Sequence, residues 1–547
     1  MTGKRKYLIF FVILWVLQMA AAFWFCTKKQ GFHEDEYYTY YSTSRTNGFY
    51  VEDGKWMDRD AYRDEFVVLP GQRFQYGLVR QVQSWDVHPP MYYWVFHTVA
   101  SLSPDVFSKW IGLSVNLFFH GINLILLSYL SYLVSEGDGK LAFWASFVYG
   151  FSPAAMSGVV FIRMYEMLTV FVLLCAVLHM RAYRSLKNKE TEAGKLSVLR
   201  ELFPMAAVTY IGFLTQYYYF IFLFFLAAAF CVWLLWRDRN IWNCLRYGVF
   251  QAAAFVLAYL TYPAFPGQMF RGQRGAQATE SFFDLSNTFD RLSFFGDLMN
   301  RFVFGGLLGV TLPALAAGAV YLQKAGEKSG KKQRGVGKVT GAGGYGMLLA
   351  ALVGYFAAVS KTALLLGDTS VRYQLPVYGI AVLLVSAAVG ALCKAASGLP
   401  WWRRMPSEAT GWITMICCIA VIAAGYRKSD VAFLYPEDAA QAAFAKEQEG
   451  SGALAVYLYN PGEEWCIWDV TNELLCYPAV YFAGTDSAEK IADERIAGAG
   501  TLVVYLAKGA DTEEQLARFF QKSGESVHNG IQLIFEEKYC DVYRLLR

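Results

Sequence analysis

Trp85-Asp86-Val87-His88-Pro89-Pro90-Met91-Tyr92-Tyr93 combines an acid, a histidine and a double proline with a run of aromatic residues. This stretch lies in a long polar interval, residues 27–108, which follows the first hydrophobic segment. The same interval opens with a second acidic and aromatic stretch, His33-Glu34-Asp35-Glu36-Tyr37-Tyr38-Thr39. Both stretches therefore follow one membrane anchor, and the rest of the chain has the pattern of a multi-span membrane protein.

The composition supports a membrane protein. The chain has 547 residues, of which 55% are hydrophobic and only 17% are charged, whereas about a quarter of the residues in a soluble protein are charged. Long apolar runs place most of the chain in a bilayer. The ten cysteines form no Cys-x-x-Cys pair and no Cys/His ligand spacing, which argues against a zinc site or a redox dithiol. We expect the lipid bilayer as a partner, and no nucleic acid.

The apolar runs predict an α-helical integral membrane protein with about eleven transmembrane helices. Each run is near the length of about 20 residues that a bilayer helix needs. The predicted spans are 7–26, 109–134, 141–160, 166–183, 203–217, 219–236, 245–263, 302–322, 346–360, 373–392 and 410–425. Pro89-Pro90 can begin a helix but cannot lie inside one, so the short aromatic run 91–102 predicts an interfacial helix.

The distribution of Lys and Arg predicts the orientation. With a cytoplasmic N-terminus, nearly every loop on the cytoplasmic side carries Lys or Arg, as the positive-inside rule requires. The interval 27–108, the turn 161–166, the loops 264–300 and 361–372 and the tail after Gly425 then lie outside. We therefore expect a multi-pass protein of the cytoplasmic membrane whose active site and C-terminal domain are extracytoplasmic.

The tail has a different composition and predicts a small α/β domain. Strands are expected at 452–458, 501–506, 531–536 and 541–545, and an amphipathic helix at 512–522 with Thr512 as its N-cap. The predicted domains are residues 1–427, a transmembrane domain that includes the outer loop 27–108, and residues 428–547.

Several charged residues are predicted to gather at the outer membrane surface. Asp35 and Glu36 follow the first span, Arg163 and Glu166 emerge in a tight turn, and Arg372 flanks the last outer loop. Charged groups at membrane depth cost a few kcal/mol and usually face an internal cavity. Carboxylates on one wall and cations on another suit a phosphate-bearing lipid and a hydroxyl acceptor, because the phosphate needs charge neutralisation and the hydroxyl needs a base.

The two stretches of the outer interval resemble the GT-C superfamily, in particular the branch that holds protein O-mannosyltransferases and lipid A aminoarabinose transferases. Three further stretches resemble that branch: 152–165 with its Arg-x-Tyr turn, Thr215-Gln216-Tyr217-Tyr218-Tyr219, and Arg372-Tyr373-Gln374-Leu375-Pro376. The resemblance implies a glycosyltransferase that moves a hexose or pentose from a polyprenyl-phosphate carrier to a glycan, lipid or protein acceptor. Direct displacement would invert the anomeric centre.

The resemblance also implies the site. Asp35 resembles the family's catalytic acid and is expected to act as the base, and Glu36 and Asp86 are the other expected catalytic residues. The expected substrate-binding residues are His88, Tyr92, Tyr93, Arg163, Tyr165, Gln216, Lys361, Arg372 and Tyr373. Phe161 and Gln216 depart from the pattern, since an acid commonly lies two residues before the Arg-x-Tyr turn and a histidine is frequent at the outer turn. A divalent cation, Mg²⁺ or Mn²⁺ held by Asp35 and Glu166, is therefore only an option.

Two other functions stay open at this point. A transporter or flippase of a lipid-linked glycan should show two similar halves with interrupted helices, and no such halves are evident in the sequence. A non-catalytic scaffold related to the GT-C enzymes would not need Asp35.

Overall fold

A computed structural model describes residues 3–44, 51–187, 195–238, 241–328, 342–396, 407–487, 493–509 and 531–546. The chain divides into two compact units. The membrane unit consists of Met1–Thr27, Gln83–Tyr92 and Gly112–Ala432, and the tail unit consists of Lys28–Val82, Tyr93–Ile111 and Phe433–Arg547. Each unit is described separately below.

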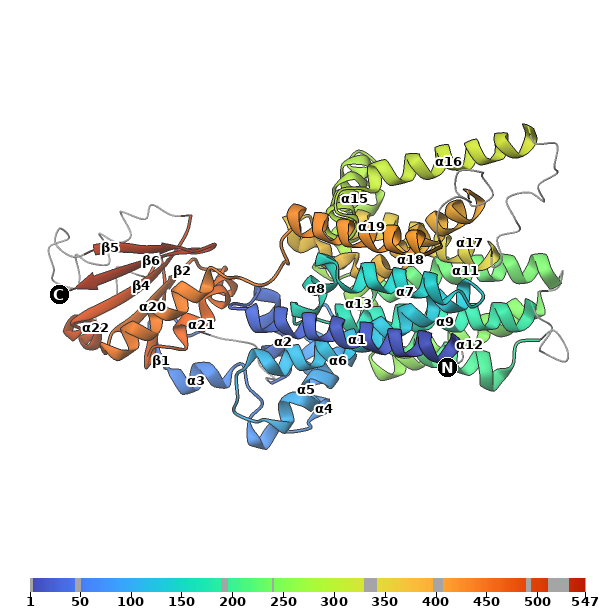
Figure 1. The fold of residues 1–547 in the computed structure, drawn as a ribbon. Helices are drawn as coiled ribbons and strands as arrows, with labels where there is room; N and C mark the ends of the chain where they lie inside the picture. The colour runs from blue at the N-terminus through green and yellow to red at the C-terminus, as the bar shows by residue number, and fades with distance from the viewer. Residues whose placement is uncertain are drawn as a thin grey trace. The chain divides into compact units, whose positions relative to one another are not determined.

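The membrane unit is built from long apolar helices that run side by side in Figure 1. Nine helices in the described ranges are long and apolar enough to cross a bilayer, which confirms a multi-pass helical protein. They are α1 (Gly3–Lys28), α6 (Lys109–Val134), α9 (Tyr165–Lys187), α10 (Phe203–Thr215, extended by the turn Val198–Leu202), α11 (Tyr218–Asp238), α12 (Trp242–Thr261), α17 (Ala342–Thr362), α18 (Leu375–Ala396) and α19 (Ser407–Lys428).

The two other predicted spans are not single helices. The predicted span 141–160 is divided into α7 (Gly139–Gly150) and α8 (Pro153–Val160). The hydroxyl of Ser152 accepts from the backbone N–H of Ala155 and Pro153 takes the first helical position, which is the usual chemistry of a new helix start. The division is thus encoded locally by Ser152-Pro153.

The predicted span 302–322 is a bent pair of helices. α15 (Thr288–Phe304) and α16 (Leu308–Lys328) meet at 86°. Gly305 and Gly306, with φ of 62° and 81°, form the bend in the left-handed region that favours glycine. A Cβ at Gly305 would also lie 2.6 Å from the carbonyl oxygen of Val421 in α19. Counting this pair as one span raises the number of candidate spans in the described ranges to ten.

The tail unit contains a six-stranded mixed sheet in the order β1-β3-β2-β4-β6-β5. The strands are β1 (Lys55–Asp58), β2 (Leu454–Tyr459), β3 (Ala479–Gly484), β4 (Thr501–Ala507), β5 (Ile531–Glu536) and β6 (Cys540–Leu546). β3, β2 and β4 are parallel, whereas β1, β5 and β6 pair antiparallel. The four strands expected in the tail are confirmed; β3 and β1 were not expected. The expected helix 512–522 lies outside the described residues.

The edge strand β1 comes from the outer interval and not from the tail. Lys55 to Asp58 pair with Phe482 to Ala479 of β3. Most of the interval 27–108 therefore packs with the tail in one unit, whereas we had expected it to form part of the transmembrane domain. A four-residue edge strand more than 400 residues away in sequence carries too little local signal for its pairing to be predicted.

Short helices complete both units. In and beside the outer interval these are α2 (Glu34–Ser42), α3 (Arg59–Asp64), the 3-10 turn Pro70–Gln72, α4 (Tyr76–Trp85) and α5 (Met91–Leu102). The helix expected at 91–102 is thus confirmed. The tail adds α20 (Asp438–Gly450), the 3-10 turn Glu464–Val470, α21 (Thr471–Leu474) and α22 (Glu494–Gly498); the membrane unit adds α13 (Phe265–Phe270), α14 (Gln273–Phe283) and the 3-10 turn Gly367–Tyr373.

Both faces of the central strands are buried. Val456, Leu458 and Val504 pack with Ile496 of α22 on one face. The rings of Tyr457 and Tyr505 stack with centroids 6.2 Å apart on the other. This explains the near-continuous apolar runs of β2 and β4, which are typical of parallel strands covered on both sides. All ten cysteines are free, including Cys466, Cys476 and Cys540 of the tail.

Candidate active site

Asp86, His88 and Arg163 form a connected chain of side chains in the membrane unit. The Oδ2 atom of Asp86 lies 3.0 Å from Nδ1 of His88, and Nε2 of His88 lies 3.3 Å from an Nη2 atom of Arg163. Arg can only donate, so Nε2 of His88 accepts from Arg163 and Nδ1 donates to Asp86. The sequence placed these three residues at one membrane surface, and the structure brings them into direct contact.

The neighbouring His88 and Arg163 stabilise the charged form of Asp86. Burial raises the pKa of the Asp86 carboxyl, but His88 and then Arg163 lower it by more, so the pKa lies below its ordinary value. Asp86 is therefore an anion at neutral pH and fixes the ring of His88. His88 in turn orients the guanidinium of Arg163, which is only 4% exposed.

Gln268 of α13 holds the loop that carries Asp86 and His88. Its side-chain nitrogen lies 2.8 Å from the carbonyl oxygen of Gln83, 2.6 Å from that of Asp86 and 2.8 Å from the hydroxyl of Tyr262. Its side-chain oxygen accepts from the hydroxyl of Tyr217. A single buried amide thus ties the motif loop to a segment about 180 residues later. Sequence reasoning missed Gln268, because a lone glutamine in a loop carries no motif.

The turn that carries Arg163 is fixed by α6. Asn116 donates through its side-chain nitrogen to the carbonyl oxygens of Val159 and Phe161, and the N–H of Arg163 donates to Phe161 at 2.7 Å. Gly112 allows the close approach, since a Cβ there would lie 2.1 Å from Cγ2 of Ile162. The backbone of the turn is therefore set before any ligand binds.

Arg372 packs against this same turn. Its guanidinium carbon lies 5.3 Å from the ring centre of Phe161, which is two residues before Arg163, and 5.0 Å from that of Tyr373. The hydroxyl of Tyr373 lies 3.2 Å from an Nη2 atom of Arg372. Arg372 is 2% exposed, and cation–π contacts of this kind stabilise a buried guanidinium. Two arginines from distant parts of the sequence therefore border one turn.

Aromatic rings surround these arginines. Tyr165 makes an edge contact with Tyr373 at 6.1 Å between ring centres and stacks with Phe161 at 5.9 Å. Tyr218 contacts Tyr373 at 6.2 Å. Tyr165 and Tyr373 were both expected at the site, and the structure brings them together.

Glu166 does not have the surroundings of a metal ligand. Its Oε1 lies 3.3 Å from Nδ1 of His120, and its Oε2 accepts from the side chain of Asn123 at 2.6 Å. A Cβ at Gly158 would lie 2.6 Å from Oε1, so helix α8 also crowds the carboxylate. Both oxygens are thus engaged by protein groups. In the described ranges, no group of three or more His, Cys, Asp or Glu side chains could hold a metal ion.

Two expected substrate-binding residues have other partners. Lys361 donates to the carbonyl of Asp284 and the side chains of Asn287 and Thr288, so its ammonium fastens the segment between α14 and α15. The Oε1 atom of Gln216 accepts from the N–H of Tyr217 at the break between α10 and α11. Neither contact involves Arg163 or Arg372.

Tyr92 and Tyr93 are core residues of their units. Their exposed fractions are 0% and 1%. They were expected to contact substrate, and in the structure their rings are packed inside the protein. His97, His120 and His179, which lie on apolar stretches of the sequence, are likewise buried.

The acids of α2 in the tail unit have three different environments. Glu36 is fully buried, with its Oε2 2.9 Å from Nζ of Lys29 and 2.7 Å from the N–H of His33. Glu34 lies 3.2 Å from Nζ of Lys538. Asp35 makes a longer contact of 3.7 Å with Nδ1 of His33, and its side chain is 33% exposed. Of the three acids, Asp35 has the most accessible side chain.

The first turn of α2 is built to hold these acids. His33 accepts from the N–H of Asp35 while Glu36 accepts from the N–H of His33, which together form a capping box. Carboxylates are favoured here because the helix dipole is positive at its N-terminus. Glu36 therefore makes structural contacts, whereas the sequence predicted a catalytic role for both Glu36 and Asp35.

Comparisons with known proteins bear on the fold. No family model matches the sequence, and no curated protein sequence matches it significantly. The structure is similar along its whole length to that of ArnT from Cupriavidus metallidurans bound to undecaprenyl phosphate: the alignment covers 98% of each chain, with a TM-score of 0.53 and 12% identity. The chain has the GT-C fold.

Two further solved structures, with lower TM-scores, are similar to this chain. Apo ArnT from the same organism has a TM-score of 0.42 and 11% identity over 93% of this chain and 96% of that one. Archaeal oligosaccharyltransferase AglB from Archaeoglobus fulgidus, in complex with an inhibitory peptide and a dolichol-phosphate, has a TM-score of 0.43 and 11% identity over 99% and 74%.

Proposed function

We propose that this GT-C chain is a membrane glycosyltransferase that transfers a sugar from a polyprenyl-phosphate carrier to an acceptor hydroxyl. The observation that carries the proposal is the convergence of Arg163 and Arg372 on one turn, with Arg163 oriented by Asp86 and His88. Paired guanidinium groups suit the oxygens of a phosphate. The structural similarity to ArnT with bound undecaprenyl phosphate supports this reading.

In the proposed reaction, the acceptor oxygen forms a bond to the anomeric carbon while the bond from that carbon to the phosphate oxygen breaks. Asp35 accepts the proton of the acceptor hydroxyl, and the polyprenyl phosphate leaves with the electron pair. Its charge increases as it leaves, so Arg163 and Arg372 stabilise the transition state more than the bound donor. A single displacement inverts the anomeric configuration. No step passes through a metal, because Glu166 already binds His120 and Asn123.

A binding and turnover experiment tests the proposal. The purified full-length protein in nanodiscs is titrated with undecaprenyl phosphate, and donor consumption is followed by mass spectrometry with a panel of polyprenyl-phosphate sugars. We expect saturable binding that Arg163→Ala and Arg372→Ala each weaken. Arg200→Ala is the matched control, since Arg200 is exposed at the start of the α10 segment. Equal affinity of the unmodified protein and the three variants for undecaprenyl phosphate, together with no turnover of any donor, would refute the proposed function.

We also propose that the catalytic face is extracytoplasmic, because the predicted loops on the other side carry most of the Lys and Arg. The side chain of Asp60 is 80% exposed, which makes Asp60→Cys a suitable reporter in a background without native cysteines. Labelling of intact cells by a membrane-impermeant maleimide is expected. Labelling that requires permeabilisation would reverse the orientation.

A further inference from the structure

An apolar groove lies in the membrane unit between α1, α6 and the turn before α7. Its cavity volume is about 950 Å³. The residues that line it are mostly aromatic or aliphatic: Tyr7, Phe11 and Trp15 on α1, and Ile125, Tyr129 and Tyr132 on α6. None of the side chains assigned to phosphate binding or catalysis lines this groove.

The groove has a defined inner end. Nε1 of Trp15 donates to the carbonyl oxygen of Gly121 at 2.9 Å, and Nε2 of Gln18 donates to that of Ser146 at 2.8 Å. A Cβ at Gly121 would lie 3.2 Å from Cζ2 of Trp15, so α1 and α6 are in close contact at this level. These polar contacts fix α1 to the bundle and close the groove.

The other end of the groove lies near the start of α1, on the predicted cytoplasmic side. Tyr7 packs against Gly139, where a Cβ would lie 3.5 Å from its ring. From Tyr7 to Gln18 the helix rises about 16 Å, about half of a hydrocarbon core of about 30 Å. The groove therefore has the depth of one leaflet. That depth suits the acyl chains of a phospholipid, whereas a long polyprenyl chain would extend past Trp15 and Gln18.

The end of the groove near Tyr7 and Gly139 is also basic. The exposed Lys140 directly follows Gly139, which lines the groove. Two acids lie nearby. Glu136 is paired with Lys187, with Nζ and Oε1 2.7 Å apart, and the carboxylate of the exposed Asp138 caps α7 by accepting from the N–H groups of Lys140 and Leu141.

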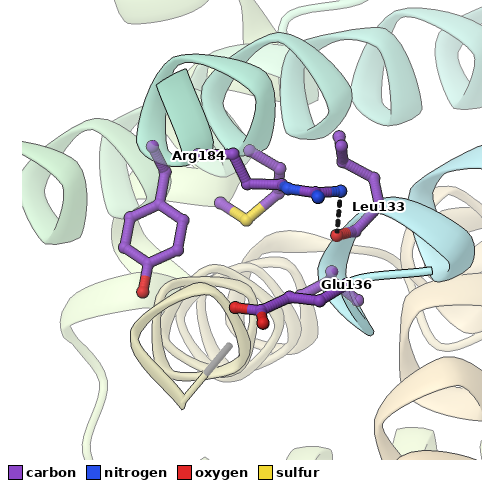
Figure 2. Close-up of a pocket in the computed structure, with 6 residues that line it drawn as sticks. Leu133, Glu136 and Arg184 are labelled. Carbon is purple, nitrogen blue, oxygen red and sulfur yellow. Dashed lines mark hydrogen bonds between the residues drawn. The ribbon is translucent and has the colours of Figure 1, made fainter. Parts of the chain in front are cut away.

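Figure 2 shows a second cation beside this end of α6. Arg184 donates to the carbonyl oxygen of Leu133 at 3.2 Å, close to Glu136. Among the described side chains, the cations Lys140, Arg184 and Lys187 therefore outnumber the acids Glu136 and Asp138 at this end, and the excess positive charge complements an anionic headgroup. Basic pockets between transmembrane helices on the cytoplasmic side bind such headgroups.

We propose that this groove binds an anionic diacyl phospholipid, with its acyl chains along α1 and α6 and its phosphate at the end that carries Lys140. The lipid would cover α1, whose apolar stretch is only 17% buried inside the protein. This site is independent of the proposed transfer reaction, and it takes a structural lipid instead of the sugar carrier.

The test is native mass spectrometry of the full-length protein after delipidation, with dioleoylphosphatidylglycerol, dioleoylphosphatidylcholine or undecaprenyl phosphate added back. We expect one phosphatidylglycerol to be retained in preference to phosphatidylcholine. Ser128→Phe fills the groove and should abolish this retention. Lys140→Glu leaves the apolar lining intact and should lower the affinity for phosphatidylglycerol alone, by about fivefold or more.

Two variants serve as controls. Val249→Phe adds an aromatic ring to the 66% exposed, lipid-facing position 249 of α12, and Lys195→Glu reverses an exposed charge elsewhere. Both should retain phosphatidylglycerol as the unmodified protein does. Equal retention of the two phospholipids, or unchanged retention by folded Lys140→Glu, would overturn the proposal. Undecaprenyl phosphate that displaces phosphatidylglycerol from the unmodified protein would identify the groove as a carrier site and would also overturn the proposal.

Discussion

The side-chain nitrogen of Gln268 lies 2.6 Å from the main-chain carbonyl oxygen of Asp86. The same amide binds Gln83 and Tyr262, so one residue of α13 sets the conformation of the loop whose side chains orient Arg163. An error of about 1 Å in the placement of a binding group can lower a rate about 100-fold. Gln268 is therefore a positioning residue of the proposed site.

We expect Gln268→Leu to lower kcat by about 10- to 100-fold while the protein stays folded, because leucine keeps the volume but loses every hydrogen bond of the amide. Steady-state kinetics with the polyprenyl-phosphate donor and a thermal unfolding scan provide the measurement. Gln277→Leu is the matched control, since Gln277 is exposed and its side-chain oxygen accepts only a long hydrogen bond of 3.4 Å from the exposed Arg274. An equal loss in both variants would indicate general damage to this segment.

The second prediction concerns Asp35. Asp35→Asn keeps the size and the backbone cap but cannot accept the acceptor's proton, so transfer should fall by about 10²–10⁴-fold. Binding of undecaprenyl phosphate and the unfolding temperature should change little, because the side chain is 33% exposed. Asp60→Asn is the control in the same unit, with an 80% exposed carboxylate. Turnover by Asp35→Asn within a few-fold of the unmodified rate would remove Asp35 from the role of base.

The third prediction concerns Glu36, the acid next to Asp35, whose ion pair should affect the unfolding temperature. Glu36 and Lys29 are both 0% exposed and 2.9 Å apart, and removal of one partner of a buried ion pair costs about 3–5 kcal/mol. Lys29→Met should therefore lower the unfolding temperature sharply. The double variant Lys29→Met/Glu36→Gln should recover much of that loss, since no unpaired charge is left and glutamine can still cap α2. A double variant as unstable as Lys29→Met would show that the ion pair is not the cause.

These contrasts mark what could be predicted from the sequence. Apolar length and Lys/Arg distribution predicted nine of the eleven spans as single helices, because those signals are long and repeated. The bend at Gly305-Gly306 interrupts an apolar run whose length predicts one continuous span, and the pairing of β1 with β3 joins segments far apart in sequence. The glycine pair is a local turn signal that the apolar run outweighed, whereas the strand pairing leaves no local pattern.

The site shows the same division. Asp86, His88, Arg163 and Arg372 were predictable because charged residues at membrane depth are rare and usually functional. The different environments of Asp35 and Glu36 were not predictable, because they depend on a buried ion pair between Lys29 and Glu36. Gln268 was not predictable either, since its importance comes from backbone carbonyls that any sequence could supply.

The fourth prediction concerns the two arginines. Lys cannot copy the planar fork of Arg, and the carrier phosphate gains charge in the transition state. Arg372→Lys should therefore lower kcat by about 10²-fold but weaken binding of undecaprenyl phosphate by less. Arg200→Lys on the exposed segment is the control. Weaker binding of undecaprenyl phosphate with an unchanged kcat would mean that Arg372 contributes to ground-state binding alone.

The last prediction is a pH dependence of stability in the tail unit. The carboxylate of Asp438 lies directly against Gly31. Burial, followed by the neighbouring Glu437, Asp469 and Glu537, raises its pKa from 3.8 to about 7, although Lys29 lowers it. Asp469 and Glu537, also mainly through burial, have pKa values raised to about 6 and about 7.

A carboxyl with a raised pKa binds its proton more tightly in the folded state than in the unfolded chain. The tail unit should therefore be most stable below about pH 4 with respect to Asp438, and should lose this stability as the pH rises through about 7. Asp438→Asn removes the charge and keeps the shape. It should raise the unfolding temperature more at pH 8 than at pH 5, whereas Asp60→Asn should behave alike at both. Thermal unfolding of the full-length variants at the two pH values measures the difference, and an equal effect of Asp438→Asn at pH 5 and pH 8 would contradict the buried, protonated carboxyl.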